Sequence, residues 1–212
     1  MKPQIAESYG WETGNAEESH SYLLSPVLKA IQKYQIKSLL DIGTGNGATI
    51  PVWLSQKIKV AAMEPDLEGY SFSSRYKEAD VRQLGVGDML PDEWKEAFDA
   101  AVSLEVVEHL FNPNHLVDTI HQTVKADGIV IISTPYHGYL KNLALAAAGK
   151  WDYHHHPARI GGHIKFWSRK TLTELFVEKG FKEISFEGVG RVPYLWKSMI
   201  LIFQKNKSYQ GN

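Results

Sequence analysis

One acidic residue and three closely spaced glycines stand together in the first quarter of this chain. Residues 39–48 read LLDIGTGNGA, so a short apolar run ends in Asp41 and the glycines follow at every second position. Glycine tolerates positive φ and lets a ligand approach backbone that a Cβ would block. A carboxylate beside such a loop offers oxygens to ligand hydroxyl or ammonium groups. The pattern predicts a buried strand, a tight loop and a helix N-terminus that hold an adenosine-containing cofactor.

Two further carboxylates follow strand-like segments. Glu64 comes about twenty residues after the glycines, where an acidic residue binds a ribose in nucleotide-binding α/β proteins. Asp88 lies in the sequence GVGDM after the third strand-like segment and can accept a hydrogen bond from an adenine amino group. We therefore expect Asp41, Glu64 and Asp88 at successive strand ends around one ligand.

The glycine pattern alone leaves two cofactor classes open. A nicotinamide or flavin dehydrogenase uses Gly-x-Gly-x-x-Gly/Ala, which Gly43, Gly45 and Ala48 satisfy. Asp41, however, would repel a pyrophosphate, whereas it suits the ammonium group of an amino acid. Residues 99–110 add a fourth strand that runs into an acidic, histidine-containing helix start. These features favour a cofactor that carries an amino acid over a dinucleotide.

Strand-like apolar runs alternate with helix-like segments along the chain. Strands are expected at 37–42, 58–63, 81–86, 100–104 and 129–134, and a helix is expected at 114–124. Such alternation predicts βαβ units, a mainly parallel sheet and helices on both of its faces. A helix over 168–179, with Ser168 as N-cap and Gly180 as its stop, then precedes an antiparallel pair at 183–187 and 199–204.

Size and composition limit the classes of function. The 212 residues fit one α/β domain, 1–212, in which 1–36 form an N-terminal helical cap and 136–166 an insertion that roofs the active site. The absence of cysteine excludes disulfides, zinc–thiolate sites and a cysteine nucleophile. A net charge of −1 argues against a DNA partner. No apolar run reaches the ~18 residues of a membrane span and no secretory signal is seen, so we expect no stable membrane insertion and a cytoplasmic location.

The chain resembles the class I S-adenosylmethionine-dependent methyltransferases over nearly its whole length. The resemblance rests on Asp41-x-Gly43-x-Gly45-x-Gly47, Glu64-Pro65-Asp66, Gly87-Asp88-Met89 and the segments 104–110 and 124–128. It implies a Rossmann-like α/β fold with a seven-stranded, mainly parallel sheet, an antiparallel last strand and helices on both faces. It also implies S-adenosylmethionine as cofactor, bound by Asp41, Gly43, Thr44, Gly45, Glu64, Pro65, Asp88, Met89 and Leu104.

The resemblance also assigns roles by position. Asp41, Gly43 and the backbone of Leu104 would contact the methionine moiety, Glu64 the ribose hydroxyls, and Asp88 with Met89 the adenine. Met89 has a second interpretation, because an apolar residue there can simply pack. The segment 9–22 likewise either closes the cofactor pocket, as similar segments do in the family, or caps the sheet edge.

Methyl transfer from a sulfonium is an in-line displacement, for which the enzyme aligns the reactants and excludes water. A hydroxyl acceptor also needs a base, and histidine titrates near neutral pH. His109 follows the fourth strand and His163 lies in the insertion, so these two are the candidate catalytic residues. The roles of His154, His155 and His156 stay open.

Within the family, the chain resembles most the branch of ubiquinone-biosynthesis O-methyltransferases, on the segments 133–135, 140–149 and 162–166. This implies a small-molecule acceptor that is methylated at oxygen. The alternatives are a methyltransferase that acts on RNA or protein, and a non-catalytic domain that binds S-adenosylmethionine. The helix 139–148 is expected to pack on the sheet or in a homodimer rather than on a membrane.

A metal site is a further open question. Some relatives bind a divalent cation through a Glu-x-x-Glu-His motif, which Glu105, Glu108 and His109 match. Their spacing of i, i+3 and i+4 places all three on one helical face. His163 resembles a later histidine in one branch with this motif. The sequence does not decide between a metal ligand set and residues that shape the cofactor site.

Overall fold

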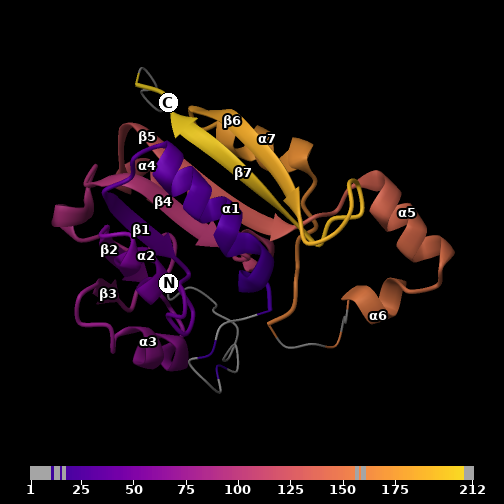
Figure 1. Ribbon diagram of the computed structural model, residues 1–212, viewed down its shortest axis with the longest axis horizontal. Helices are drawn as coiled ribbons and strands as arrows, with labels where there is room; N and C mark the ends of the chain where they lie inside the picture. The colour runs from indigo at the N-terminus through magenta and orange to yellow at the C-terminus, as the bar shows by residue number, and fades with distance from the viewer. Residues whose placement is uncertain (1–10, 12–14, 16–17, 156–157, 159–160, 208–212) are drawn as a thin grey trace.

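A single seven-stranded sheet organises the molecule (Figure 1). The computed structural model describes Trp11, Asn15, residues 18–155, Ala158 and residues 161–207. The strands are β1 (Ser38–Ile42), β2 (Lys59–Met63), β3 (Asp80–Arg82), β4 (Phe98–Leu104), β5 (Val124–Pro135), β6 (Phe181–Val189) and β7 (Ser198–Lys205). Their order in the sheet is β3-β2-β1-β4-β5-β7-β6.

The pairing confirms the expected Rossmann-like α/β fold. Strands β3, β2, β1, β4 and β5 pair in parallel, whereas β7 runs antiparallel to both β5 and β6. The third strand ends at Arg82, so the expected strand over 81–86 is wrong in its second half. The reason is a turn, in which Asp88 Oδ2 accepts a hydrogen bond from the backbone N–H of Gly85 at 2.7 Å.

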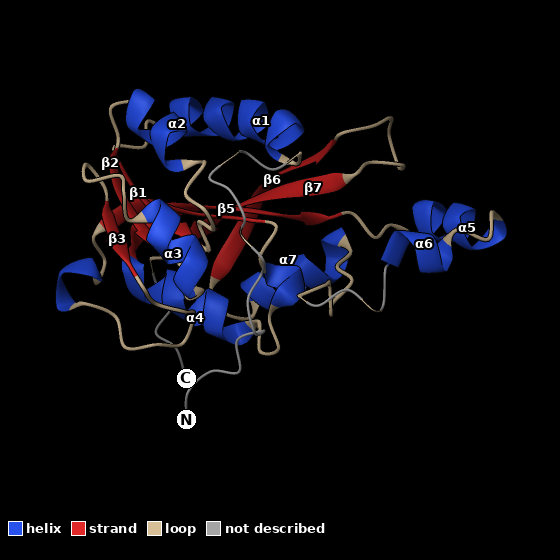
Figure 2. Ribbon diagram, turned by 90° about the horizontal axis from the view of Figure 1, so that it is seen from below, coloured by secondary structure: helices blue, strands red, loops and turns tan. Residues whose placement is uncertain are grey.

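Helices cover both faces of the sheet, as Figure 2 shows in a view along its edge. The α-helices are α1 (His20–Lys33), α2 (Ile50–Ser55), α3 (Leu67–Ser73), α4 (Asn114–Thr123), α5 (Tyr139–Ala147), α6 (Trp151–His155) and α7 (Arg169–Val177). Two 3₁₀ turns, η1 (Asp92–Trp94) and η2 (Val107–His109), flank β4. Helices α1 and α2 pack on one face and α4 and α7 on the other, so all five residues of β1 are buried.

The helix ends follow the expected local chemistry. The Ser168 side chain caps α7 by accepting a hydrogen bond from the backbone N–H of Thr171. The Thr171 hydroxyl in turn accepts one from the backbone N–H of Ser168. Gly180 follows with φ +81°, a conformation that favours glycine. In α4, the buried residues Leu116, Val117 and Ile120 form the apolar stripe that faces the sheet.

The helices α5 and α6 form an arm that projects beyond the carboxyl end of β5 and the amino end of β7, which runs antiparallel to it (Figures 1 and 2). Packing of α5 on the sheet is therefore a wrong expectation. Large apolar side chains stay exposed there because the arm extends past the sheet, among them Tyr139, Leu140 and Leu143, each more than half exposed. Within the described part of the chain, no helix has the length and apolar character needed to cross a membrane.

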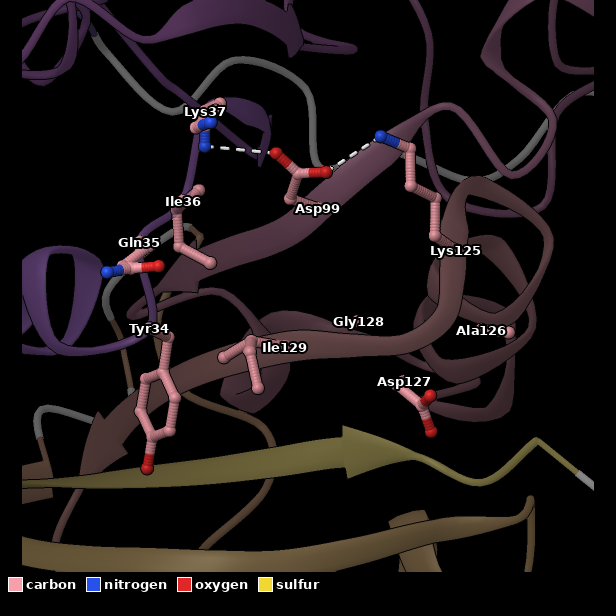
Figure 3. Close-up of a pocket in the computed structure, with 10 residues that line it drawn as sticks. All are labelled: Tyr34, Gln35, Ile36, Lys37, Asp99, Lys125, Ala126, Asp127, Gly128 and Ile129. Carbon is pink, nitrogen blue, oxygen red and sulfur yellow. Dashed lines mark hydrogen bonds and ion pairs between the residues drawn. The ribbon is translucent and has the colours of Figure 1, made fainter.

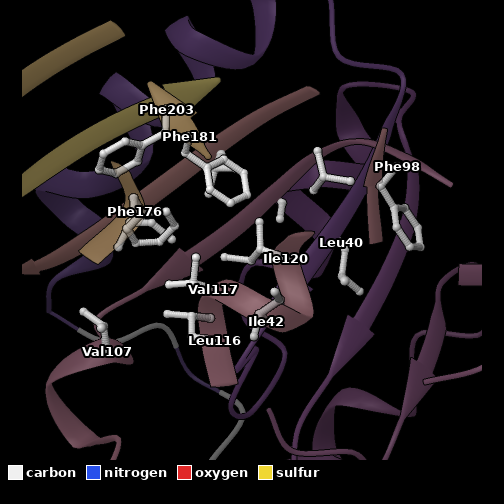
Figure 4. Packing of buried hydrophobic residues seen from close by; sticks show 14 of the residues in the cluster. Leu40, Ile42, Phe98, Val107, Leu116, Val117, Ile120, Phe176, Phe181 and Phe203 are labelled. Atoms are coloured by element: carbon white, nitrogen blue, oxygen red, sulfur yellow. The ribbon is translucent and has the colours of Figure 1, made fainter. Parts of the chain in front are cut away.

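Stacked aromatic rings fix α7 against the last two strands (Figure 4). The rings of Phe176 and Phe203 stack with centroids 4.4 Å apart, and Phe181 meets Phe176 edge-on at 5.7 Å. All three side chains are almost completely buried. Since this cluster joins the antiparallel strands to the rest of the core, it determines the position of the loop that precedes α7.

We predict that Phe203→Ala lowers the free energy of unfolding by about 3–5 kcal/mol, because it removes a stacked ring and leaves a cavity. Val177→Ala, on the exposed side of α7, should change the free energy of unfolding by less than about 0.5 kcal/mol. Denaturation by guanidinium followed by circular dichroism measures both values. A loss below about 1 kcal/mol for Phe203→Ala would contradict the packing described.

Candidate functional site

The glycine loop lies at the carboxyl end of β1, the edge where open α/β sheets bind ligands. Gly43, Gly45 and Gly47 all have positive φ, at +74°, +57° and +78°. The backbone N–H groups of Gly43 and Thr44 donate to the carbonyl of Met63, at 2.9 and 3.2 Å. The loop is thereby tied to the end of β2, and only glycine adopts this sequence of turns without strain.

Asp41 anchors this loop from beneath. Its Oδ2 accepts hydrogen bonds from the Thr44 hydroxyl at 3.2 Å, the Thr49 hydroxyl at 2.7 Å and the Trp53 indole N–H at 2.8 Å. The carboxyl is buried, and burial raises its pKa. One oxygen is therefore committed to holding the loop and α2, while contact with a methionine moiety remains a prediction for Asp41.

Glu64 closes the loop at its tip. It is 4 % exposed, with Oε2 accepting from the backbone N–H of Gly45 at 2.7 Å and Oε1 from that of Asp66 at 2.9 Å. Burial raises the pKa of Glu64 to about 7. The side chain thus lies directly on the glycine loop, while contact with ribose hydroxyls remains a prediction for Glu64.

The predicted adenine contacts lie on the neighbouring turn after β3. Asp88 is half-buried and caps Gly85, as described above, and Pro65 lies beside that glycine, since a Cβ there would be 3.4 Å from the Pro65 Cβ. Met89 is 92 % exposed, so the interpretation that it packs in the core is wrong. The Met89 thioether is exposed beside this turn, and its contact with adenine remains a prediction.

Trp11 brings the N-terminal segment onto the glycine loop. A Cβ at Gly45 would lie 2.6 Å from Cζ2 of the indole, and one at Gly69 would lie 3.1 Å from its Cδ1. The Asn46 side chain also donates to the carbonyl of Asn15 at 2.8 Å. The described part of segment 9–22 therefore contacts the predicted cofactor side, while Tyr9 and Gly10 lie outside the described residues.

Residues at the end of β4 carry the second half of the site. Directly after Leu104, Glu105 adopts a left-handed conformation with φ +56°, which is unusual for a non-glycine residue. Its carboxylate accepts hydrogen bonds from the hydroxyls of Ser133 at 2.7 Å and Ser198 at 3.0 Å. Strands β5 and β7 thus hold Glu105 in this conformation.

Glu108, His109 and His163 converge beside it. One ligand atom of each lies within 4.8 Å of the other two, and the two imidazole rings meet edge-on at 4.9 Å. Glu108 is 1 % exposed; its Oε2 accepts from the Thr134 hydroxyl, whereas its Oε1 has no hydrogen-bond partner among the described residues. The structure therefore brings together three of the four candidate ligands and leaves Glu105 outside the group.

The backbone explains how residues so distant in sequence meet. The carbonyl of Glu108 accepts from the N–H groups of Ile164 and Lys165, both at 3.0 Å. His109 Nδ1 lies 3.3 Å from the carbonyl of Gly162. These bonds dock the loop before α7 on η2, and His163 is placed by that docking.

Burial also perturbs the acids of this half. It raises the pKa of Glu105 to about 7 and that of Glu108 well above its usual range. Neighbouring carboxylates whose pKa values are raised in a crowded site are typical of functional centres. The group can therefore hold a proton or a cation near neutral pH.

A separate hollow lies at the opposite edge of the sheet (Figure 3). It is lined by residues 34–37 and 125–129 together with Asp99, which bonds the backbone N–H of Lys37 at 3.0 Å and the ammonium of Lys125 at 2.7 Å. These residues precede β1 and lie at the beginnings of β4 and β5. The hollow is thus remote from the glycine loop and takes no part in the site.

Sequence reasoning missed several residues of the site. Thr49, the N-cap residue of α2, and Trp53 within it bind Asp41, and their polar atoms beside apolar neighbours are the signal in the sequence. Ser133 and Ser198 hold Glu105, but Ser198 follows it by more than ninety residues and carries no local signal.

Comparisons with known proteins agree with this geometry. A family model described as a methyltransferase domain matches residues 16–185. A probable S-adenosylmethionine-dependent methyltransferase of Mycobacterium tuberculosis is 24 % identical over 161 residues, which are 75 % of this chain and 54 % of that protein. The ubiquinone biosynthesis O-methyltransferase of Caulobacter vibrioides is 32 % identical over 124 residues, 53 % of this chain and 46 % of that protein. The chain thus spans about half the length of these relatives.

A solved structure shows the same fold. The Burkholderia thailandensis 1,6-didemethyltoxoflavin-N1-methyltransferase, bound to 1,6-didemethyltoxoflavin and S-adenosylhomocysteine, superposes with a TM-score of 0.64. The two proteins are 18 % identical, and the match covers 86 % of this chain and 76 % of that one.

The raised pKa of Glu64 leads to a prediction on stability. Because the folded state favours the protonated form, the contribution of Glu64 is present below its unfolded value of 4.5 and is lost as the pH rises through about 7. When the pH is lowered from 8 to 5, the unfolding free energy of the wild type should rise by about 2.5 kcal/mol relative to that of Glu64→Gln. Urea denaturation of both proteins at each pH measures this; parallel pH profiles would contradict it.

Proposed function

The chain belongs to the methyltransferase domain family and is a class I S-adenosylmethionine-dependent enzyme; on that premise we propose that it methylates a small molecule at an oxygen atom. The observation that carries this proposal is the pair His109 and His163 beside the buried Glu108. His109 follows β4, the strand whose end the family places at the methyl donor, and the loop before α7 brings His163 to it. A base at this position suits a hydroxyl acceptor.

The cofactor would lie across the glycine loop. We propose that Gly43 and Gly45, with Thr44 beside them, line its path, that Glu64 accepts from the ribose hydroxyls, and that Asp88 with Met89 and Pro65 borders the adenine. Asp41 and the Leu104 backbone would face the methionine end. The location of these residues at neighbouring strand ends supports the assignment, because a single extended ligand can reach all of them.

His109 has the geometry of a base. When its Nδ1 carries the proton and donates to the carbonyl of Gly162, Nε2 is left with a lone pair. His163 then faces His109 at ring distance and can take up or relay the proton. Bound S-adenosylmethionine would supply the methyl group to the acceptor oxygen, and Nε2 of His109 would take the proton of the acceptor hydroxyl.

A divalent cation is an alternative role for the same group of residues, because an imidazole nitrogen that binds the ion cannot act as the base. The supporting observation is Glu108 Oε1, a buried carboxylate oxygen without a partner among the described residues, close to both imidazoles. Carboxylate and imidazole donors together accept Mg²⁺, Mn²⁺ or Zn²⁺. Glu108, His109 and His163 would hold the ion, which would supply Lewis-acid activation of the acceptor oxygen.

The comparisons support a small acceptor. The Caulobacter relative is by name a ubiquinone biosynthesis O-methyltransferase, and the Burkholderia neighbour acts on a small heterocycle at nitrogen. The near-neutral net charge counts against an RNA substrate. An acceptor on RNA or protein, and a domain that binds the cofactor without turnover, remain the alternatives.

A homodimer through the exposed apolar side chains of α5 is a further proposal, tested by light scattering.

We predict that His109→Gln and His163→Gln each reduce methyl transfer to phenolic and catecholic acceptors by about 10²–10⁴-fold, because the hydroxyl loses its base. Radiolabelled S-adenosylmethionine and a panel of small hydroxyl, amine and thiol acceptors provide the assay. His121→Gln, in the last turn of α4 and outside the predicted site, is the control and should retain activity. Transfer to amines or thiols alone, or full activity in both variants, would contradict O-methylation by this pair.

The metal proposal has a separate test. Wild-type protein should bind one Mn²⁺ per chain, seen as loss of the free-ion signal in electron paramagnetic resonance, and Glu108→Gln should weaken this binding at least about tenfold. Glu93→Gln, an exposed acid near β3, is the matched control. If Mn²⁺ is not taken up, or is taken up equally by the Glu108 variant, the cluster is not a metal site.

A further inference from the structure

The first turn of α5 and the short helix α6 bring a second group of chemically active side chains together. It lies at the base of the arm, where the chain leaves β5. The rings of His137 and His155 stack at 5.6 Å, and both meet Phe166 edge-on, at 5.0 and 4.8 Å. Lys141 lies on the same turn of α5 and adds its charge to both histidines. None of these residues belongs to the predicted cofactor site.

Several polar atoms in this group are buried without a hydrogen-bond partner among the described residues. They are both ring nitrogens of His137, Nε2 of His155 and Oδ1 of Asn142. His137 is only 7 % exposed, and Asn142 lies against it without a bond of good geometry. Buried polar atoms in proteins almost always have hydrogen-bond partners, so a concentration of unpaired ones marks a candidate ligand site.

The charge of this cluster favours an anion as its ligand. Lys141 is 6 % exposed, and its Nζ donates to the carbonyl of Lys197 at 3.3 Å; within the described chain it forms no ion pair. The Arg191 charge disfavours its protonated form further. The charge of Glu105 favours the protonated form, but Glu105 makes no ion pair with Lys141, and a buried cation without a directly paired anion is unfavourable. The site therefore favours a ligand with negative charge.

The helix itself adds to the positive potential. α5 begins at Tyr139 with no side-chain cap and no acidic residue in its first turn. The positive end of its dipole and its free backbone N–H groups therefore lie beside His137 and Lys141. Together with the unpartnered histidine nitrogens, this helix start has the donors that bind an oxyanion.

We propose that His137, Lys141, His155 and the first turn of α5 form a subsite for the carboxylate or phosphate group of the methyl acceptor. The inference rests on the proposed function, since it assigns to the acceptor an anionic group at one end and a hydroxyl at the other. Burial lowers the pKa of Lys141 to about 8 and that of His137 to about 4. A bound anion would reverse both shifts and compensate the buried charge.

The location of the subsite fits one ligand that spans both regions. The backbone N–H of His137 donates to the carbonyl of Trp167 at 3.2 Å, so the loop 162–167 connects the two. Phe166 of this loop packs on His137, and His163 of the same loop faces His109. The charge of Glu105, just after β4, also acts on Lys141 and raises its pKa.

A metal ion is the competing occupant, and the structure disfavours it. Among the described residues, the ligand atoms of Glu108, His109 and His163 lie within 4.8 Å of one another, whereas the three histidines of the arm form no such group. Lys141 and Arg191 would also repel a cation. An oxyanion satisfies the same nitrogens and both positive charges.

Thermal unfolding of the full chain in phosphate, benzoate or chloride at equal ionic strength tests the proposal. Phosphate or benzoate at about ten times its Kd should raise the wild-type Tm by about 3–6 °C above the value in chloride. Lys141→Met should lose this rise and have a higher Tm than wild type in chloride, because an unpaired buried cation is removed. Lys150→Met, an exposed lysine just after α5, should behave as wild type.

The two anions distinguish the two sources, since a rise with benzoate alone indicates a carboxylate and one with phosphate alone a phosphate ester. No anion-specific rise in the wild type, or an equal rise in Lys141→Met, would overturn the subsite. Calorimetry of S-adenosylhomocysteine with the same proteins separates the two proposals. Absent nucleoside binding with an intact anion response would refute the proposed function alone.

Discussion

The attachment of the glycine loop to two buried carboxylates is the interaction on which the rest of the site depends. Asp41 holds the loop and α2 from within the sheet, and Glu64 bonds the amide of Gly45 at its tip. The parallel register of β1 and β2 brings these carboxylates side by side. Both acids are desolvated, and they are tolerated because hydroxyl, indole and backbone donors surround them. The loop therefore has one conformation, with its amides and glycines presented to a ligand.

The site has an electrostatic polarity that matches the reaction. Four carboxylates lie at or just after the carboxyl ends of β1, β2 and β4, namely Asp41, Glu64, Glu105 and Glu108. They surround the expected methyl donor, which carries a positive sulfonium and an ammonium group. The arm, where we propose that the acceptor binds, instead presents Lys141 with histidine nitrogens that have no hydrogen-bond partner among the described residues. A cationic donor and an anionic acceptor would each meet charge of the opposite sign. The loop 162–167, docked on η2, lies where the two regions meet.

Local patterns made the fold and the first half of the site predictable. The strand, glycine loop and acidic residues are contiguous in sequence, so their relation follows from backbone geometry and the parallel register. The third strand and the helix 139–148 were harder, because a turn cap at Asp88 and the projection of α5 depend on contacts outside each segment. His109 and His163 were found as separate candidates, but their contact depends on backbone bonds to Glu108. In the cluster around His137, the sequence drew attention to His155 without a role, since the meaning of the cluster comes from burial and missing partners.

The central claim is that Glu64 and the glycine loop bind S-adenosylmethionine, and calorimetry tests it most directly. Titration of S-adenosylmethionine and of NAD into wild type, Glu64→Ala and the exposed control Glu68→Ala compares the cofactors and the residue in one experiment. The account predicts one-to-one binding of S-adenosylmethionine, at least about tenfold weaker binding in Glu64→Ala, and wild-type affinity in Glu68→Ala. Unchanged affinity in Glu64→Ala, or binding of NAD in place of the sulfonium, would contradict it.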